Sequence, residues 1–75
     1  MKVLFFGKLK EITKKSEMEI KGIKDLSELK SFLYKKFPEI EREIFFIAVN
    51  QKICDGDTDL KEEDEIAFLP PISGG

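Results

Sequence analysis

The chemistry open to this chain of 75 residues is narrow, because the usual catalytic residue types are missing or stand alone. There is no histidine, which excludes Ser-His and Cys-His nucleophilic pairs and metal sites that need an imidazole. The single cysteine, Cys54, cannot build a disulfide within the chain or a zinc or iron–sulfur site alone. Nothing in the sequence activates its thiol. We therefore interpret Cys54 as a small apolar filler at the end of a strand.

Residues 55–59 are rich in aspartate and superficially resemble a calcium-binding loop. The glycine that such a loop requires would fall at Leu60, and the bidentate glutamate at Ile66. Neither residue fits, and the glycines are too scattered for a phosphate-binding loop. The sequence therefore predicts no metal site and no bound cofactor.

The remaining reactive group is the carboxylate of Gly75, at the end of a distinctive stretch. Residues 66–69 are a continuous apolar run, typical of a strand buried on both faces. Pro70 and Pro71 end that strand, because proline has no N–H for a sheet ladder and fixes φ near the extended value. The pattern predicts a stiff arm over residues 69/70–75, with six extended residues reaching about 19 Å. Gly74 and Gly75 lack a Cβ, so the tip could thread a narrow channel.

This arm resembles the tail of the ubiquitin-like sulfur carriers, and most of all the small subunits of molybdopterin synthase in the MoaD/ThiS family. The likeness covers nearly the whole chain. Its more specific part precedes the two glycines, since thiazole-pathway carriers usually lack the double proline. The segments that carry the resemblance are Lys2-Val3-Leu4-Phe5-Phe6-Gly7, Ala48-Val49-Asn50-Gln51 and Ala67-Phe68-Leu69-Pro70-Pro71-Ile72-Ser73-Gly74-Gly75.

The resemblance implies a sulfur carrier subunit that is not an enzyme on its own. An E1-like, ATP-dependent adenylyltransferase would join AMP to Gly75, and a sulfur donor would displace the AMP and leave a thiocarboxylate. The loaded arm would then enter the large catalytic subunit, within an expected heterotetramer, and give its sulfur to cyclic pyranopterin monophosphate. Gly74 would be needed for threading the tail into that subunit.

Three other functions stay open from the sequence. The same glycine pair would serve a ubiquitin-like modifier that forms isopeptide bonds with lysines. A thiazole-pathway sulfur carrier would also need it, although Pro70 and Pro71 disfavour that function. The last alternative is a plain binding domain of the same fold whose tail is inert.

The arm needs a folded body to hold it, and the apolar pattern supplies five strands and one main helix. Asp25 and Glu28 have the spacing of a capping box at the helix start, and Pro38 ends the helix. An apolar stripe faces the core, consisting of Leu26, Leu29, Leu33 and Phe37, while Lys30, Lys35 and Lys36 face out. The expected strands are residues 3–6, 17–21, 45–49, 52–54 and 66–69, with one or two helical turns in residues 8–15.

The resemblance to ubiquitin implies an α+β fold, the β-grasp. It would have a mixed five-stranded sheet of order 2-1-5-3-4, parallel first and last strands, one main helix on one face and a flexible C-terminal tail. We expect one domain over residues 1–75.

Alternation separates the two faces of the central strands. Val3, Phe5, Ile66 and Phe68 would point to the core, because Lys2 shares the opposite face with Leu4 and Phe6. An exposed patch would then join Phe6 to Leu69 beside the arm, unless residues 8–15 cover it. The predicted partner-binding residues are Phe6, Leu69, Pro70, Pro71, Ile72 and Ser73.

Charge is unevenly distributed along the chain. Residues 1–37 hold ten lysines against five acidic residues, whereas residues 38–75 hold three basic residues against ten acidic ones. The lysines are spread over several elements, which disfavours nucleic acid as a partner. The acidic half would be a solvated surface or would steer a basic partner. No apolar run approaches a membrane span, and no signal peptide is present, so we expect a cytoplasmic protein without a membrane partner.

Overall fold

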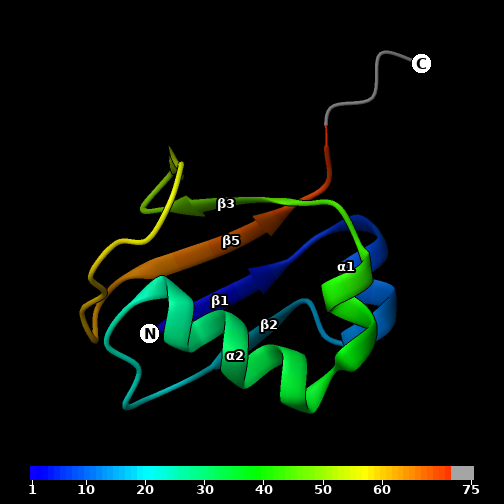
Figure 1. The fold of residues 1–75 in the computed structure, drawn as a ribbon, viewed down its shortest axis with the longest axis horizontal. Helices are drawn as coiled ribbons and strands as arrows, with labels where there is room; N and C mark the ends of the chain where they lie inside the picture. Colours follow the sequence, from blue (N-terminus) through cyan, green and yellow to red (C-terminus); the bar gives the residue numbers. More distant parts are fainter. Residues whose placement is uncertain (72–75) are drawn as a thin grey trace.

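Two strands from opposite ends of the chain lie side by side at the centre of one sheet (Figure 1). The computed structural model describes residues 1–71. The order β2-β1-β5-β3-β4 and the parallel pairing of β1 with β5 confirm the predicted topology. The elements are β1 (Lys2–Phe5), α1 (Gly7–Thr13), β2 (Glu17–Glu19), α2 (Leu26–Lys36), the 3₁₀ helix η1 (Pro38–Arg42), β3 (Phe46–Val49), β4 (Lys52–Cys54) and β5 (Glu65–Leu69).

The core lies between the sheet and α2, as the alternation predicts. Phe5 and Phe68 are almost fully buried, and their ring centroids are 5.8 Å apart. α2 contributes Leu26, Leu29 and Leu33, which are also buried. Because residues on one face of a strand recur every second position, the neighbours of Phe5 and Phe68 point to the other face.

α2 begins as its sequence predicts. The carboxylate of Asp25 accepts a hydrogen bond from the backbone N–H of Glu28 at 2.8 Å. The Glu28 side chain reaches back to accept from the backbone N–H of Lys24 at 2.9 Å. These bonds satisfy donors that an α-helix leaves unpaired at its start.

A second carboxylate fixes the same helix start from the loop after β4. Asp57 accepts hydrogen bonds from the backbone N–H of Ser27 at 3.0 Å and from its hydroxyl at 2.8 Å. These bonds, with that of the Ser27 hydroxyl the strongest influence, hold the pKa of Asp57 below its ordinary value. The loop is thereby tied to the N-terminus of α2.

The turn between β3 and β4 is tied to the start of β5. Asn50 and Gln51 have φ values of 50° and 71°, the left-handed pair of a tight hairpin. The Asn50 side chain donates to Asp64 at 2.9 Å and accepts from the backbone N–H of Glu65 at 3.0 Å. Asp64 also accepts from the backbone N–H of Lys61, and these hydrogen bonds, that of Asn50 first, lower the pKa of its carboxyl.

Some predictions were wrong in detail. β1 spans residues 2–5 where residues 3–6 were predicted, and β3 begins at Phe46, one residue later than predicted. β2 ends at Glu19, two residues before the predicted end. Lys30, expected to face out, is half-buried and faces a groove between α2 and β3. Within residues 1–71, no helix is long and apolar enough to cross a membrane.

Candidate functional site

The base of the arm is the part of the predicted site that the structure describes. Pro70 and Pro71 leave the end of β5 and are both exposed. Neither ring nitrogen carries a hydrogen, so neither residue can continue the ladder with β1 or β3. The predicted residues Ile72, Ser73, Gly74 and Gly75 lie outside the described residues.

Pro70 lies close to Gly7, at the junction of β1 and α1. A Cβ built on Gly7 would lie 3.4 Å from both Cβ and Cγ of the Pro70 ring, which is ordinary van der Waals contact. Gly7 has a φ of +58°, a conformation that side chains disfavour. Glycine is thus favoured here by its backbone conformation.

Around this base lies an apolar surface, which we call the outer sheet face. Phe46 of β3 pairs directly with Leu69 of β5, so the two side chains share the face opposite α2. Phe46 is 47% exposed and Phe6 is 42% exposed, while Leu69 is half-buried. A second row follows the register across four strands and consists of Leu4, Ala67, Ala48 and Ile53.

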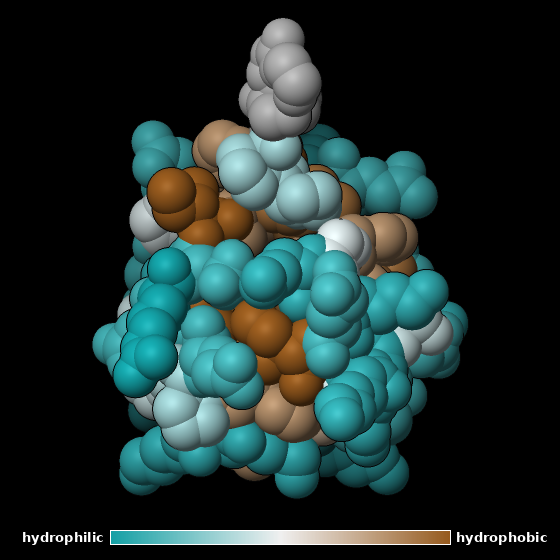
Figure 2. Space-filling view, turned by 90° about the vertical axis from the view of Figure 1, so that its right-hand side faces the viewer, coloured by the Kyte–Doolittle hydropathy of each residue, from teal (hydrophilic) through white to brown (hydrophobic). Residues whose placement is uncertain are grey.

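A cavity of about 260 Å³ lies at the foot of the arm. Ile44, which is 77% exposed, stands beside it on the segment that leads into β3. Figure 2 shows hydrophobic surface next to the base of the arm, bordered by hydrophilic side chains. The lining residues are Phe6, Lys8, Leu9, Arg42, Glu43, Ile44, Pro70 and Pro71.

α1 does not cover this surface. Its Leu9 turns into the core and is buried, while Phe6 remains exposed at the start of the helix. The alternative in which residues 8–15 hide the patch is therefore wrong, and the predicted exposed patch is present. Exposed apolar surface of this kind is typical of protein–protein contact.

The arrangement supplies a binding surface, which is apolar at its centre and has the charged residues Lys8, Arg42 and Glu43 beside it. Within residues 1–71 there is no cluster of three or more His, Cys, Asp or Glu side chains that could hold a metal. Cys54 lies at the end of β4, where it packs against the core. Such a surface can hold a partner protein.

The structure brings together four of the predicted partner-binding residues, namely Phe6, Leu69, Pro70 and Pro71. It adds Phe46 and Ile44, which the sequence analysis missed. Alternation along β3 would have placed Phe46 on the outer sheet face, since Ile47 is a core residue. No local signal marks the contact between Gly7 and Pro70, because it joins opposite ends of the chain.

Comparison with known proteins gives consistent matches over the whole chain. Residues 3–75 match the ThiS family. A molybdopterin synthase sulfur carrier subunit from Dictyostelium discoideum is 40% identical over 81 residues, with 99% of this chain and 94% of that protein covered.

Two solved structures are similar to this fold. One is a complex of subunits 1 and 2 of molybdopterin-converting factor from Helicobacter pylori 26695. That match has 38% identity and a TM-score of 0.75, with 99% of this chain and 96% of that chain covered. The other is the small archaeal modifier protein 1 from Methanosarcina acetivorans, with 29% identity, a TM-score of 0.82 and coverage of 99% and 94%.

Proposed function

Because the chain belongs to the ThiS family, we propose that it is the sulfur carrier subunit of a molybdopterin synthase. Its partner would be the large catalytic subunit, in a heterotetramer. The similarity to a two-subunit complex of molybdopterin-converting factor supports this assignment. The single observation that carries it is the sheet strand that ends at an apolar docking face and continues as Pro70-Pro71-Ile72-Ser73-Gly74-Gly75.

The chemistry would take place at Gly75 and would be driven by partners in the cytoplasm. On an E1-like enzyme, the terminal carboxylate would attack the α-phosphate of ATP. This step would form an acyl-adenylate and release pyrophosphate. A sulfur donor would then replace AMP and leave the thiocarboxylate. On the large subunit, that sulfur would attack cyclic pyranopterin monophosphate. Two loaded carriers used in turn would provide both sulfurs of the dithiolene.

In this proposal the folded body contributes docking and orientation. Phe6, Phe46 and Leu69 would be covered by the partner, which removes apolar surface from water. Pro70 and Pro71 restrict the arm before it binds, so less conformational entropy is lost when the arm is threaded. Gly7 lies beside Pro70 at the base of the arm.

A direct test is to load the chain and weigh it. The chain is incubated with its E1-like enzyme, ATP and a sulfur donor, and intact mass is measured. We expect the gain that corresponds to replacing one oxygen by sulfur. It should require ATP and should be lost when Gly75 is deleted. An unchanged mass in the complete reaction would contradict the proposal.

A second candidate function is a protein modifier that forms isopeptide bonds with lysines. The match to a small archaeal modifier protein favours it, because that protein has the same fold at 29% identity. Both functions need an activated Gly75, so the loading test does not separate them. High-mass adducts in cells, lost on deletion of Gly75, would support the modifier function. Their absence, with thiocarboxylate formed, would leave the carrier function alone.

A further inference from the structure

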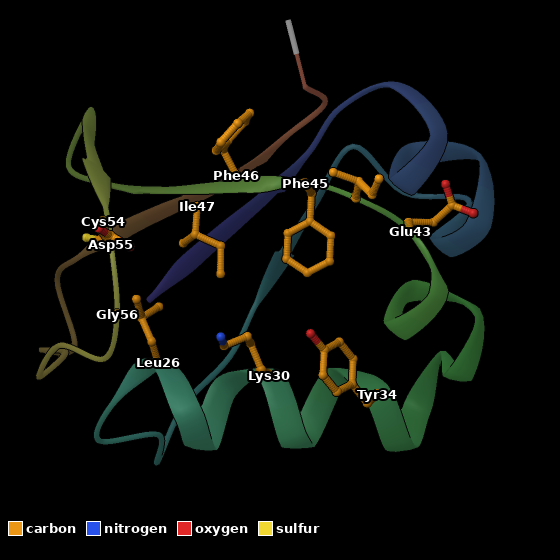
Figure 3. Close-up of a pocket in the computed structure, with 11 residues that line it drawn as sticks. Leu26, Lys30, Tyr34, Glu43, Phe45, Phe46, Ile47, Cys54, Asp55 and Gly56 are labelled. Carbon is orange, nitrogen blue, oxygen red and sulfur yellow. The ribbon is translucent and has the colours of Figure 1, made fainter.

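A groove of about 390 Å³ lies between α2 and β3, on the face of the sheet opposite the outer sheet face (Figure 3). We call it the α2–β3 groove. Leu26 on α2 and Phe45 and Ile47 on the β3 side provide its apolar walls. Phe46 points away from α2, so the groove and the outer sheet face lie on opposite sides of β3.

The groove exists because β4 is short. β4 pairs with β3 only from Ile47 to Val49, and the chain then turns away at Gly56, whose φ is +107°. The bonds from Ser27 to Asp57 draw the following loop toward the start of α2. The pairing with β4 stops at Ile47, so β4 does not cover the edge of β3 at Phe45.

The uncovered edge presents backbone groups at Phe45. The backbone N–H of Asn50 donates to the carbonyl oxygen of Glu65, so by alternation Ala48 and Phe46 direct their backbone groups to β5. Val49 and Ile47 direct theirs to Lys52 and Cys54 of β4. By alternation, the N–H and C=O of Phe45 point to the same side as those of Ile47. In residues 1–71 neither group has a hydrogen-bond partner. An extended peptide is the ligand that satisfies such an edge.

Charge along the groove specifies the peptide further. Lys30 is half-buried and lines the groove from the middle of α2, with its amino group toward the Leu26 end, and it forms no ion pair among the described residues. Burial, with a smaller effect of Glu41, raises the pKa of Tyr34, so its hydroxyl stays protonated and can donate a hydrogen bond. Glu43 and Asp55 lie toward the two ends of the groove. These charges fit a ligand that is acidic at its centre and neutral or basic at its ends.

We propose that the α2–β3 groove binds an extended peptide segment of a partner protein. The segment pairs with the backbone of Phe45, lays an apolar side chain against the half-buried rings of Tyr34 and Phe45, and turns a carboxylate to Lys30. The binding does not involve the arm, although Ile44 and Phe46 line the groove and also border the apolar surface around the base of the arm.

The test uses the ¹⁵N-labelled full chain and a blocked pentapeptide with a central aspartate, a valine on each side and a lysine at each end. We expect saturable amide shifts at Phe45, Ile47 and Gly56. Replacing the peptide aspartate by asparagine should weaken binding about tenfold, as for loss of a charge-assisted bond. Two further peptides carry N-methyl groups that remove the backbone N–H donors along one edge of the extended peptide or along the other. Only the peptide that lacks the N–H donors facing β3 should bind more weakly.

Lys30→Glu should weaken the aspartate peptide at least about tenfold, whereas Lys35→Glu, an equal change of charge on the same helix, should not. The proposal is overturned if no shift saturates at millimolar peptide. It is also overturned if the shifts map to Phe6 and Leu69, or if the aspartate and asparagine peptides bind equally. Loading of Gly75 in Lys30→Glu should match the wild type, so the result is independent of the proposed carrier function.

Discussion

The two ends of the sheet are held in different ways. At the turn end, where β5 begins, Asn50, Asp57 and Asp64 bind backbone N–H groups or other side chains by directed hydrogen bonds. At the arm end, where β5 ends, Pro70 lies beside Gly7. Among the described residues, no side-chain hydrogen bond reaches Pro70 or Pro71.

This difference separates folding from partner binding. Directed hydrogen bonds fix the loops of the turn end, which is not part of the proposed partner-binding surface. The arm end has exposed apolar side chains and an arm without ladder bonds, so a partner can cover it without first breaking polar contacts. The comparison predicts that substitutions at the turn end change stability and those at the arm end change binding.

The largest effect should come from two neighbours on β5 that face opposite ways. Phe68→Asp buries an unpaired charge in the core and should cost more than about 4 kcal/mol, enough to unfold a small domain. Leu69→Asp should keep the fold but weaken binding to the large subunit by about 2 kcal/mol or more. Circular dichroism and titration calorimetry measure the two effects. Equal unfolding of both variants would break the assignment of faces.

At the turn end, Asn50→Ala removes two side-chain hydrogen bonds and puts alanine at a positive φ. We expect a loss of about 1–2 kcal/mol and a Tm lower by roughly 5–10 °C. Binding to the large subunit should be unchanged. Gln51→Ala is the matched control, because Gln51 has a positive φ but no side-chain hydrogen bond among the described residues. If both variants lose the same free energy of unfolding, the two side-chain hydrogen bonds of Asn50 contribute nothing to stability.

Two glycines with positive φ sharpen the comparison at the arm end. Gly7→Ala and Gly22→Ala should each cost about 1 kcal/mol in backbone strain. The methyl group added at Gly7 would reach ordinary van der Waals contact with Pro70, whereas nothing lies within 4 Å of a Cβ at Gly22. Because the added methyl group requires no movement of Pro70, affinity for the large subunit should stay near the wild-type value in both variants. A severalfold loss in Gly7→Ala alone would mean that Gly7 positions the base of the arm.

The smallest effect concerns pH at the turn end. Because hydrogen bonds from Ser27 lower the pKa of Asp57, its contribution to stability is complete above about pH 4 and is lost as pH falls through the lowered value. The stability difference between wild type and Asp57→Asn should therefore narrow on acidification. Urea unfolding between about pH 5 and 2 measures it.

Much of the architecture was predictable because short-range patterns determine it. Alternation placed Phe68 inside and Leu69 outside, and the spacing of Asp25 and Glu28 marked the start of α2. The order of strands came from family resemblance. Pattern alone could not supply it, since β1 and β5 pair across the length of the chain.

What the sequence could not reveal depends on contacts between distant segments. Lys30 follows the polar side of a helical pattern, yet it faces a groove because Asp57 draws the loop after β4 away from β3. The packing of Pro70 on Gly7 is equally invisible to periodicity. The position of Lys30 depends on where the loop after β4 lies, and the proximity of Pro70 and Gly7 depends on how the sheet closes. Neither feature produces a pattern in the nearby sequence.

The central position of β5 makes the whole sheet depend on one strand. β5 follows every other described strand in sequence, yet it lies between β1 and β3. Until it inserts, the pair of β1 and β2 and the hairpin of β3 and β4 are not joined, and the core lacks Ile66 and Phe68. We therefore expect the two halves of the sheet to fold cooperatively, in a step that the insertion of β5 completes.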